Sequence, residues 1–189
     1  MKERIYHAAV IQMMYRGLKF SIRDVASQLG ISTKTIYAHY ESKDQIIAYM
    51  VDRSIQEMIE NEQSIMSNES LSFKQKLRLA LVNIPQGTAL SDVRILRDLQ
   101  KLYPEQWKKV DEHLNHGWDY IRRLIQEGMA SEALRPFDVE LFIRVYVGAM
   151  YHLMDNQLPG QTALLLDKAL SEMVDLLLNG IFNDGKGGQ

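Results

Sequence analysis

Polar side chains that can bind phosphates or the edges of bases are concentrated between residues 33 and 39. Hydroxyl, ammonium, phenol and imidazole groups all occur in this short stretch, as Thr33, Lys34, Thr35, Tyr37 and His39. If the stretch is helical, Thr33, Lys34 and Tyr37 lie opposite the more apolar Ile36 and Tyr40. Such groups could contact the backbone and the bases of a nucleic acid. The alternative is an ordinary solvated helix face, which carries the same kinds of residue.

The residues before this stretch predict a first short helix and a tight turn. Ser21 and Asp24 have the spacing of a capping box at a helix start, and Gly30 can adopt the left-handed conformation that ends a helix. Ser32 can then cap a second helix almost at once. So short a connection favours the angled helix-turn-helix, whose second helix enters the major groove of DNA. We therefore expect residues 33–39 to face DNA.

Lys43 occupies an unfavourable position unless an anion binds beside it. Ser42 and Gln45 form a second capping pattern, which places Lys43 in the first turn of the next helix. The helix dipole disfavours a cation there. A phosphate docked at this helix start would explain the lysine, because free backbone N–H groups and the ammonium would bind it together. A surface lysine without such a role is the alternative.

Residues 5–47 resemble the DNA-binding domain of the TetR family of bacterial one-component repressors. The family pattern runs from Ile-x-x-Ala-Ala to Gly-Val-Ser-x-x-Thr-Leu-Tyr-x-His-Phe-x-Ser-Lys. The matching residues are Ile5, Ala8, Ala9, Gly17, Arg23, Asp24, Ala26, Gly30, Ile31, Ser32, Thr35, Ile36, Tyr37, His39, Tyr40, Ser42 and Lys43. Two features depart from the pattern: Lys34 stands where the family often has a small residue, and the segment between Gly17 and Asp24 is one residue shorter.

The resemblance implies separate tasks for the candidate DNA-binding residues. Thr35, Tyr37 and Lys43 would contact phosphates. Bases or neighbouring phosphates would be contacted by Arg23, Thr33, Lys34 and His39, and Ser21 completes the candidate set. By the same resemblance, the protein would be a transcriptional regulator that binds double-stranded DNA.

Composition and charge agree with a DNA-binding head on a separate body. Residues 1–50 hold seven Lys and Arg against four Asp and Glu, whereas residues 51–189 hold fifteen against twenty. A mildly basic head on an acidic body indicates that only the head approaches DNA. The chain has no cysteine, no run of about 18 apolar residues and no signal-peptide pattern. We expect a cytoplasmic protein without disulfides and without a membrane partner.

The sequence beyond residue 47 predicts helices almost throughout. Apolar periodicity and the positions of proline indicate helices near 42–66, 72–84, 91–102, 104–129, 138–156 and 162–182. With three helices in the head, this gives an all-α fold of about nine helices. We expect a helix-turn-helix domain over 1–47, a helical ligand-binding and dimerisation domain over 48–183, and a flexible tail over 184–189.

The last predicted helix carries more apolar residues than one buried stripe requires. They are Ala163, Leu164, Leu166, Leu170, Met173, Val174, Leu177, Leu178 and Ile181. We expect a second apolar face that meets another copy of the chain, the alternative being complete burial within one monomer. In the resembled family the two helices nearest the C-terminus form a four-helix bundle across a two-fold axis. A homodimer would read a roughly palindromic DNA site.

The body contains a candidate ligand cavity but no catalytic pattern. Its candidate lining residues are Arg94, Tyr103, Trp107, Trp118, Tyr146 and Met150. Aromatic residues and methionines among helices are also common in an ordinary core, which is the alternative. His113 and His116 share a predicted helix face, but no metal site or cofactor is expected.

The leading hypothesis is a repressor released by an unknown small-molecule effector. The alternatives are an activator of the same fold, an enzyme of unrecognised type, and a helical adaptor that binds proteins.

Overall fold

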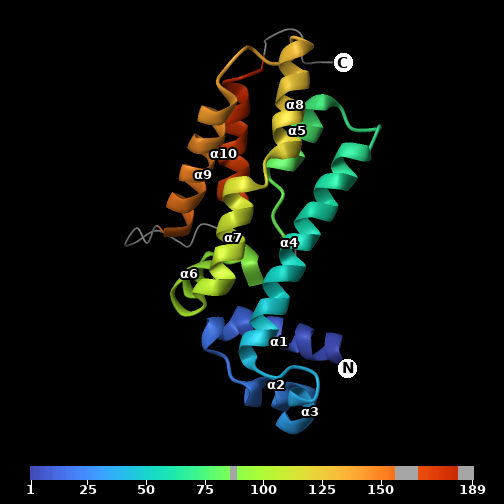
Figure 1. Ribbon diagram of the computed structural model, residues 1–189, viewed down its shortest axis with the longest axis vertical. Helices are drawn as coiled ribbons and strands as arrows, with labels where there is room; N and C mark the ends of the chain where they lie inside the picture. The colour runs from blue at the N-terminus through green and yellow to red at the C-terminus, as the bar shows by residue number, and fades with distance from the viewer. Residues whose placement is uncertain (86–88, 156–165, 183–189) are drawn as a thin grey trace. The chain divides into compact units, whose positions relative to one another are not determined.

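The computed structural model describes residues 1–85, 89–155 and 166–182. Within these ranges the chain forms ten α-helices and two short 3₁₀ helices (Figure 1), and its β-structure there is limited to one isolated bridge between Leu134 and Phe182. The prediction of an all-α fold is therefore confirmed. The elements are α1 (Lys2–Arg16), η1 (Gly17–Lys19), α2 (Ile22–Leu29), α3 (Thr33–Tyr37), α4 (Lys43–Ser67), α5 (Phe73–Leu81), η2 (Ala89–Ser91), α6 (Val93–Leu102), α7 (Pro104–His116), α8 (Asp119–Ala130), α9 (Val139–Asp155) and α10 (Leu166–Asn179).

The chain divides into two compact units. The first unit comprises Met1–Gln56 and Pro85–Asp111, and the second comprises Glu57–Ile84 and Glu112–Gln189. Helices α4 and α7 each contribute residues to both units, because the boundaries fall inside them. The domain limits at residues 47 and 183 remain a prediction, and residues 162–165 and the predicted tail lie outside the described residues.

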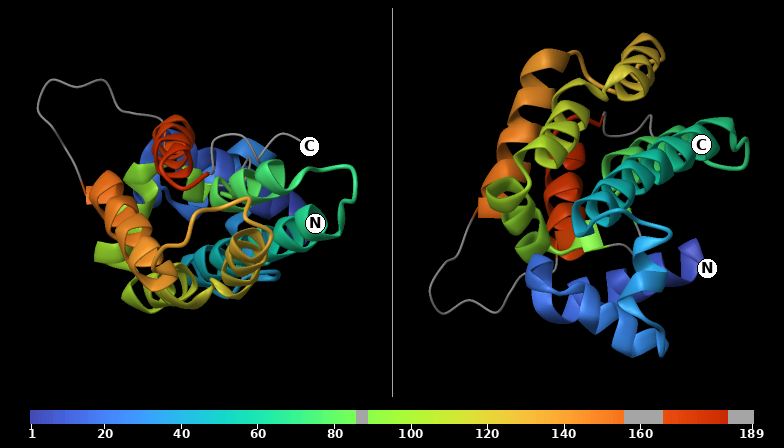
Figure 2. Two further views of the ribbon diagram at one scale, coloured as in Figure 1. Left: turned by 90° about the horizontal axis from the view of Figure 1, so that it is seen from above. Right: turned by 60° about the horizontal axis from the view of Figure 1, so that its bottom comes forward.

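The core of the first unit is built from the apolar stripes of its helices. Helix α1 packs against α2 and η1, α2 packs against α3, and α6 packs against η1 (Figure 2). The side chains that are almost fully removed from solvent include Ile5, Met13, Phe20, Val25, Ile36, Tyr40, Ile47 and Ile95. The long α4 enters this core through Ile46, Ile47 and Met50. Packing of these stripes, more than the propensity of such short helices, keeps α2 and α3 folded.

The second unit holds its helices together by apolar packing and by a few long-range polar contacts. Helix α5 packs against α8 and α10, and α9 lies beside α10 (Figure 2). The guanidinium of Arg78 on α5 donates to both carboxylate oxygens of Asp175 at 2.7 and 3.0 Å and to the hydroxyl of Ser171 at 2.6 Å. These bonds fix the position of α10 along α5, since a bidentate pair tolerates little sliding.

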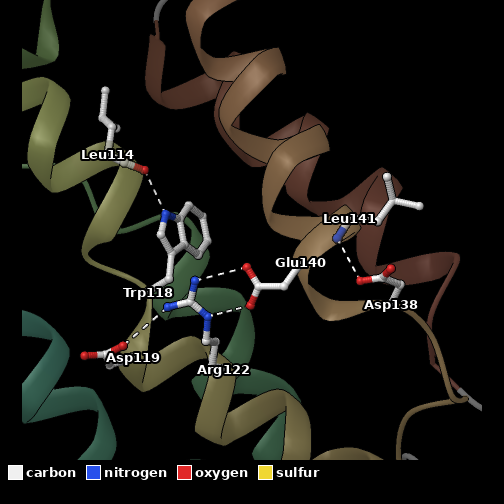
Figure 3. A network of polar contacts seen from close by, with 7 residues as sticks. All are labelled: Leu114, Trp118, Asp119, Arg122, Asp138, Glu140 and Leu141. Atoms are coloured by element: carbon white, nitrogen blue, oxygen red, sulfur yellow. Dashed lines mark hydrogen bonds and ion pairs between the residues drawn. The ribbon is translucent and has the colours of Figure 1, made fainter.

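The prediction of a single helix over 104–129 is wrong, because the helix is interrupted between α7 and α8 at Gly117 and Trp118. In an uninterrupted helix the backbone N–H of Trp118 would donate to the carbonyl of Leu114. Instead the indole Nε1 of Trp118 donates to that carbonyl at 2.7 Å (Figure 3), and the backbone N–H of Trp118 donates to His116. A Cβ at position 117 would lie 2.7 Å from the carbonyl oxygen of His113. The break therefore depends on a glycine and a tryptophan together, and two helices, α7 and α8, stand where the sequence predicts one.

Polar contacts around the start of α9 connect it to α8. The guanidinium of Arg122 donates to both carboxylate oxygens of Glu140 at 2.8 and 3.2 Å, and to Asp119 at 3.3 Å (Figure 3). Asp138 accepts the backbone N–H of Leu141 at 3.0 Å, as a residue at a helix start commonly does. Trp118 immediately precedes α8, and its carbonyl accepts the backbone N–H of Arg122 at 2.9 Å.

Replacing Gly128 by alanine is expected to lower the stability of the protein. A Cβ at this position of α8 would lie 2.3 Å from Cζ of Phe73 and 2.9 Å from side-chain carbons of Leu134. The change from glycine to alanine favours the helix by about 1 kcal/mol, but overpacking costs about 1–3 kcal/mol, so we expect a net loss of up to about 2 kcal/mol in urea unfolding. The control is the double variant with Phe73→Ala, whose loss should be smaller than the sum of the two single losses. A Gly128→Ala protein more stable than the wild type would contradict the packing described here.

Candidate nucleic-acid interface and ligand cavity

The local structure of α2 and α3 follows from their caps. The hydroxyl of Ser21 accepts the backbone N–H of Asp24 at 3.2 Å, and the Asp24 carboxylate accepts the backbone N–H of Ser21 at 2.8 Å. Gly30 ends α2 with φ 64° and ψ 33°, in the left-handed region that glycine adopts without a Cβ clash. The hydroxyl of Ser32 then accepts the N–H of Thr35 at 3.1 Å and starts α3. The helix-turn-helix predicted from these capping residues is confirmed.

The candidate DNA-binding residues differ in exposure. Arg23 on α2 is exposed, as are Lys34, Tyr37 and His39 in and after α3, with half of the Tyr37 surface open to solvent. Thr33 and Thr35 are partly buried, and the Thr35 hydroxyl lies 2.9 Å from the hydroxyl of Ser32. The Ser21 hydroxyl donates to Asp24 at 2.7 Å, so its own donor is used inside the cap. The groups that α3 and the turn after it offer to a partner are thus the ammonium, the phenol and the imidazole. Their contacts with DNA remain a prediction.

Lys43 has an intramolecular partner that the sequence did not reveal. Its Nζ donates to the carbonyl of Leu18 at 2.5 Å and lies 4.6 Å from the centre of the Phe20 ring. Partial burial lowers the pKa of this ammonium. The lysine therefore ties the start of α4 to the segment between α1 and α2, which explains part of its unusual position. Because an ammonium has three N–H donors, the bond to Leu18 leaves capacity for a phosphate.

A cavity of about 90 Å³ lies within the second unit. Its apolar wall includes Met58, Ile84, Leu114 and Ile121. Of the six candidate ligand residues, the structure brings Trp118, Tyr146 and Met150 together around this cavity. The other three, Arg94, Tyr103 and Trp107, belong to the first unit and do not line it. Arg94 is exposed and pairs with Asp92 at 2.6 Å.

The polar lining of the cavity lies outside the set of ligand residues predicted from the sequence. It consists of Glu62 on α4, Asn83 after α5 and His113 on α7. Burial raises the pKa of Glu62 to about 7, although the positive charge of Arg123 lowers it in part. Burial also lowers the pKa of His113, which favours a neutral imidazole. The rings of Trp118 and Tyr146 meet edge to face beside these groups, with centres 4.9 Å apart. Residues this far apart in the chain give no local pattern that predicts their meeting.

Replacing Glu62 by glutamine is expected to stabilise the protein at alkaline pH. Folding raises the pKa of this carboxyl from 4.5 to about 7. Its contribution to stability is therefore complete below pH 4.5 and is lost as the pH rises through about 7, because burial disfavours the ionised form. Allowing for partial exposure of the side chain, the variant should gain about 1–2 kcal/mol above pH 7 and nothing below pH 4.5. The free energy of urea unfolding of both proteins, measured below pH 4.5 and above pH 7, tests this difference.

The control for Glu62 is the exposed Glu69, which lies in the turn between α4 and α5. Glu69→Gln should leave the free energy of unfolding unchanged at both pH values. A Glu62→Gln protein no more stable than the wild type at alkaline pH would show that the carboxyl is not held in an unfavourable environment.

The described residues show no cluster of three or more His, Cys, Asp or Glu side chains that could hold a metal ion. His113 is partly buried at the cavity, whereas His116 is exposed. None of the helices in the described ranges combines the length and the apolar character needed to cross a membrane.

The comparisons with known proteins agree with this architecture. Residues 5–50 match the family model of bacterial regulatory proteins, tetR family. The uncharacterized HTH-type transcriptional regulator YvaF of Bacillus subtilis (strain 168) is 31% identical over 184 residues, which is 97% of each chain. The solved structure of the ketosteroid transcriptional regulator KstR2 of Mycobacterium tuberculosis superposes with a TM-score of 0.68 at 18% identity, covering 97% of this chain and 95% of that one. AibR in complex with isovaleryl coenzyme A and operator DNA gives a TM-score of 0.62 at 16% identity, covering 93% and 96%.

These similarities establish the class of protein. The chain belongs to the tetR family of bacterial regulatory proteins. It is a DNA-binding transcriptional regulator whose helix-turn-helix is formed by α2 and α3.

Proposed function

We propose that the protein is a cytoplasmic repressor that binds a palindromic operator as a homodimer and is released by a small-molecule effector. The observation that supports this most strongly is the combination of an exposed polar recognition surface in one unit with a partly polar cavity in the other. A protein of the same fold, AibR, has been solved with both operator DNA and isovaleryl coenzyme A. Binding of both kinds of partner by this chain is the proposal.

Apolar side chains exposed on α9 and α10 support a dimer. Leu141 and Val145 are 59% and 49% exposed and lie one turn apart on α9, while Leu176 on α10 is 75% exposed. Gly148 continues the same face of α9, and a Cβ there would meet nothing within 4 Å. The buried stripe of α10 is complete without Leu176, since Leu170, Val174 and Leu178 fill it. An exposed apolar surface of this kind fits a second copy of the chain.

A single helix offers a route from the effector to DNA. Met58 and Glu62 line the cavity, and both lie on α4, the helix that begins at Lys43. Lys43 is about four helical turns from Met58 and holds the segment before α2 through Leu18. An effector releases DNA if it binds more tightly to the conformation in which the two recognition helices no longer fit the operator.

The direct test is a mobility shift of the DNA that flanks the protein's own gene. At low salt the wild-type protein should retard this DNA, with an affinity that falls steeply as salt increases. Light scattering should give the mass of a dimer in the free protein. Failure to retard the flanking DNA at low salt, or a monomeric mass at the concentrations that bind DNA, would contradict the proposal.

A further inference from the structure

Most of the hydrogen-bond donors around the cavity are already used within the protein. The indole N–H of Trp118 donates to Leu114 at 2.7 Å, and the hydroxyl of Tyr146 donates to the carbonyl of Leu81 at 2.5 Å. The side-chain amide of Asn83 donates to the carbonyl of Met58 at 2.7 Å. These bonds use the only side-chain donors of Trp118 and Tyr146 and one of the two amide N–H groups of Asn83.

The polar groups that remain are mainly acceptors. Within the described part of the chain, no hydrogen bond or ion pair involves the carboxyl of Glu62, and none involves the side-chain carbonyl of Asn83. A neutral His113 adds one ring nitrogen that accepts and one that donates. These partly buried acceptors favour a ligand that brings donors, because a polar group without a partner in such a site is costly.

We infer that the cavity binds a small primary amine, with Glu62 as the counter-ion of its ammonium group. This inference rests on the proposed function, since it names the class of effector for the cavity. Trp118 and Tyr146 provide aromatic walls that attract a cation as well as an alkyl chain. The ammonium carries three donors for Glu62, Asn83 and His113. A carboxylate of the same shape would face Glu62 with like charge and no donor.

The size of the cavity limits the ligand. A cavity of about 150 Å³ holds benzene, so the 90 Å³ available here suits a branched chain of about four carbons. Isobutylamine, isobutanol and isobutyrate share such a skeleton and differ only in the polar group. Comparing their affinities shows whether the cavity prefers an ammonium group, a neutral hydroxyl donor or a carboxylate.

The test measures these three probes on the ¹⁵N-labelled full-length protein without DNA. The chain has two tryptophans, of which Trp118 lines the cavity and Trp107 does not, so their indole N–H signals provide a reporter and an internal reference. The variant Trp107→Phe assigns the two signals. Isobutylamine should move the Trp118 signal saturably at concentrations on the order of 10 mM, as suits so small a ligand. It should bind at least about tenfold more tightly than isobutanol, and isobutyrate should not bind.

The affinity for isobutylamine should rise about tenfold between pH 6 and pH 8, because an ammonium requires the ionised form of Glu62. The other titratable or charged groups that act on this carboxyl are Arg123 and Asp119 of α8, and His113 also lines the cavity from α7. His113 loses any positive charge over the same range, which also favours a cation. Binding of isobutanol should not change with pH.

The matched variants decide the role of Glu62. Glu62→Gln should bind isobutylamine no better than isobutanol while still binding isobutanol as the wild type does, and Glu69→Gln should behave as the wild type in every titration. The inference is overturned if no probe moves the Trp118 signal, if isobutanol or isobutyrate binds as tightly as isobutylamine, or if Glu62→Gln keeps the preference for the amine.

The outcome is independent of the test of the proposed function. A protein that retards its operator but does not bind isobutylamine would refute the amine site alone. A protein that binds isobutylamine through Glu62 but does not retard the flanking DNA would keep the amine site and refute the proposed repressor.

Discussion

Replacing both Lys34 and Tyr37 by alanine is expected to lower operator affinity at least about thirtyfold. Both side chains are exposed on α3, and among the described residues neither makes a side-chain hydrogen bond or ion pair. Each good contact to a base edge or phosphate contributes about 1–3 kcal/mol, so the loss of two contacts has a large effect. Removing one lysine should also reduce the salt slope of binding by about one. Fluorescence anisotropy over a range of salt concentrations measures both quantities.

The controls remove the same chemical groups from other helices of the first unit. Lys101 on α6 and Tyr15 on α1 are exposed, with Tyr15 83% open to solvent. The Lys101→Ala/Tyr15→Ala protein should bind the operator within about threefold of the wild type, because surface changes away from an interface have little effect. Equal losses in the two double variants would show that α3 has no special role in DNA binding.

The single variants distinguish contacts to bases from contacts to phosphates. Tyr37→Ala should weaken binding to all sequences alike, whereas Lys34→Ala should also change which bases are preferred. Competition with randomised half-sites distinguishes these outcomes. An unchanged base preference in Lys34→Ala would assign this lysine to the phosphate backbone.

Introducing negative charge on the exposed face of α9 is expected to separate the proposed dimer and abolish tight operator binding. Leu141→Glu/Val145→Glu would place two carboxylates of each copy in the proposed interface, where they must be desolvated beside like charges. A monomer binds only one half-site, so operator affinity should fall more than about a hundredfold. Light scattering gives the mass, and a mobility shift gives the affinity.

The control for this variant is Leu102→Glu, which adds charge at another exposed leucine, 49% open to solvent on α6. This protein should remain dimeric and bind normally. If Leu141→Glu/Val145→Glu stays dimeric, the subunits meet elsewhere and the interface proposed for α9 and α10 is incorrect.

Local rules were sufficient to predict the helix-turn-helix. Ser21, Asp24, Gly30 and Ser32 act on backbone groups within three or four residues, so their effect is visible in the order of the chain. The same rules failed at Trp118, whose periodicity fits a continuing helix. There the decision depends on the bond from its own indole to Leu114 and on the close approach at Gly117, which no apolar pattern encodes.

The remainder of the site depends on contacts between distant segments. Lys43 was noticed because its charge opposes the helix dipole, but its partner Leu18 is 25 residues away. Glu62 could not be predicted as a site residue, because an acidic residue on a long amphipathic helix is usually solvated. Only the fold shows that it lines a cavity together with residues of α5, α7 and α9. Trp118 and Tyr146 were identifiable as aromatic residues of the body, although only the fold shows that their rings meet beside Glu62.

The most direct measurement is selection of the sequences that the protein binds from random DNA. The proposed homodimer predicts enrichment of an inverted repeat whose half-sites are separated by about one turn of DNA or more. The Lys34→Ala/Tyr37→Ala protein, carried through the same selection, should enrich nothing. Absence of any enriched sequence with the wild-type protein, or equal enrichment by the double variant, would contradict operator recognition through α3.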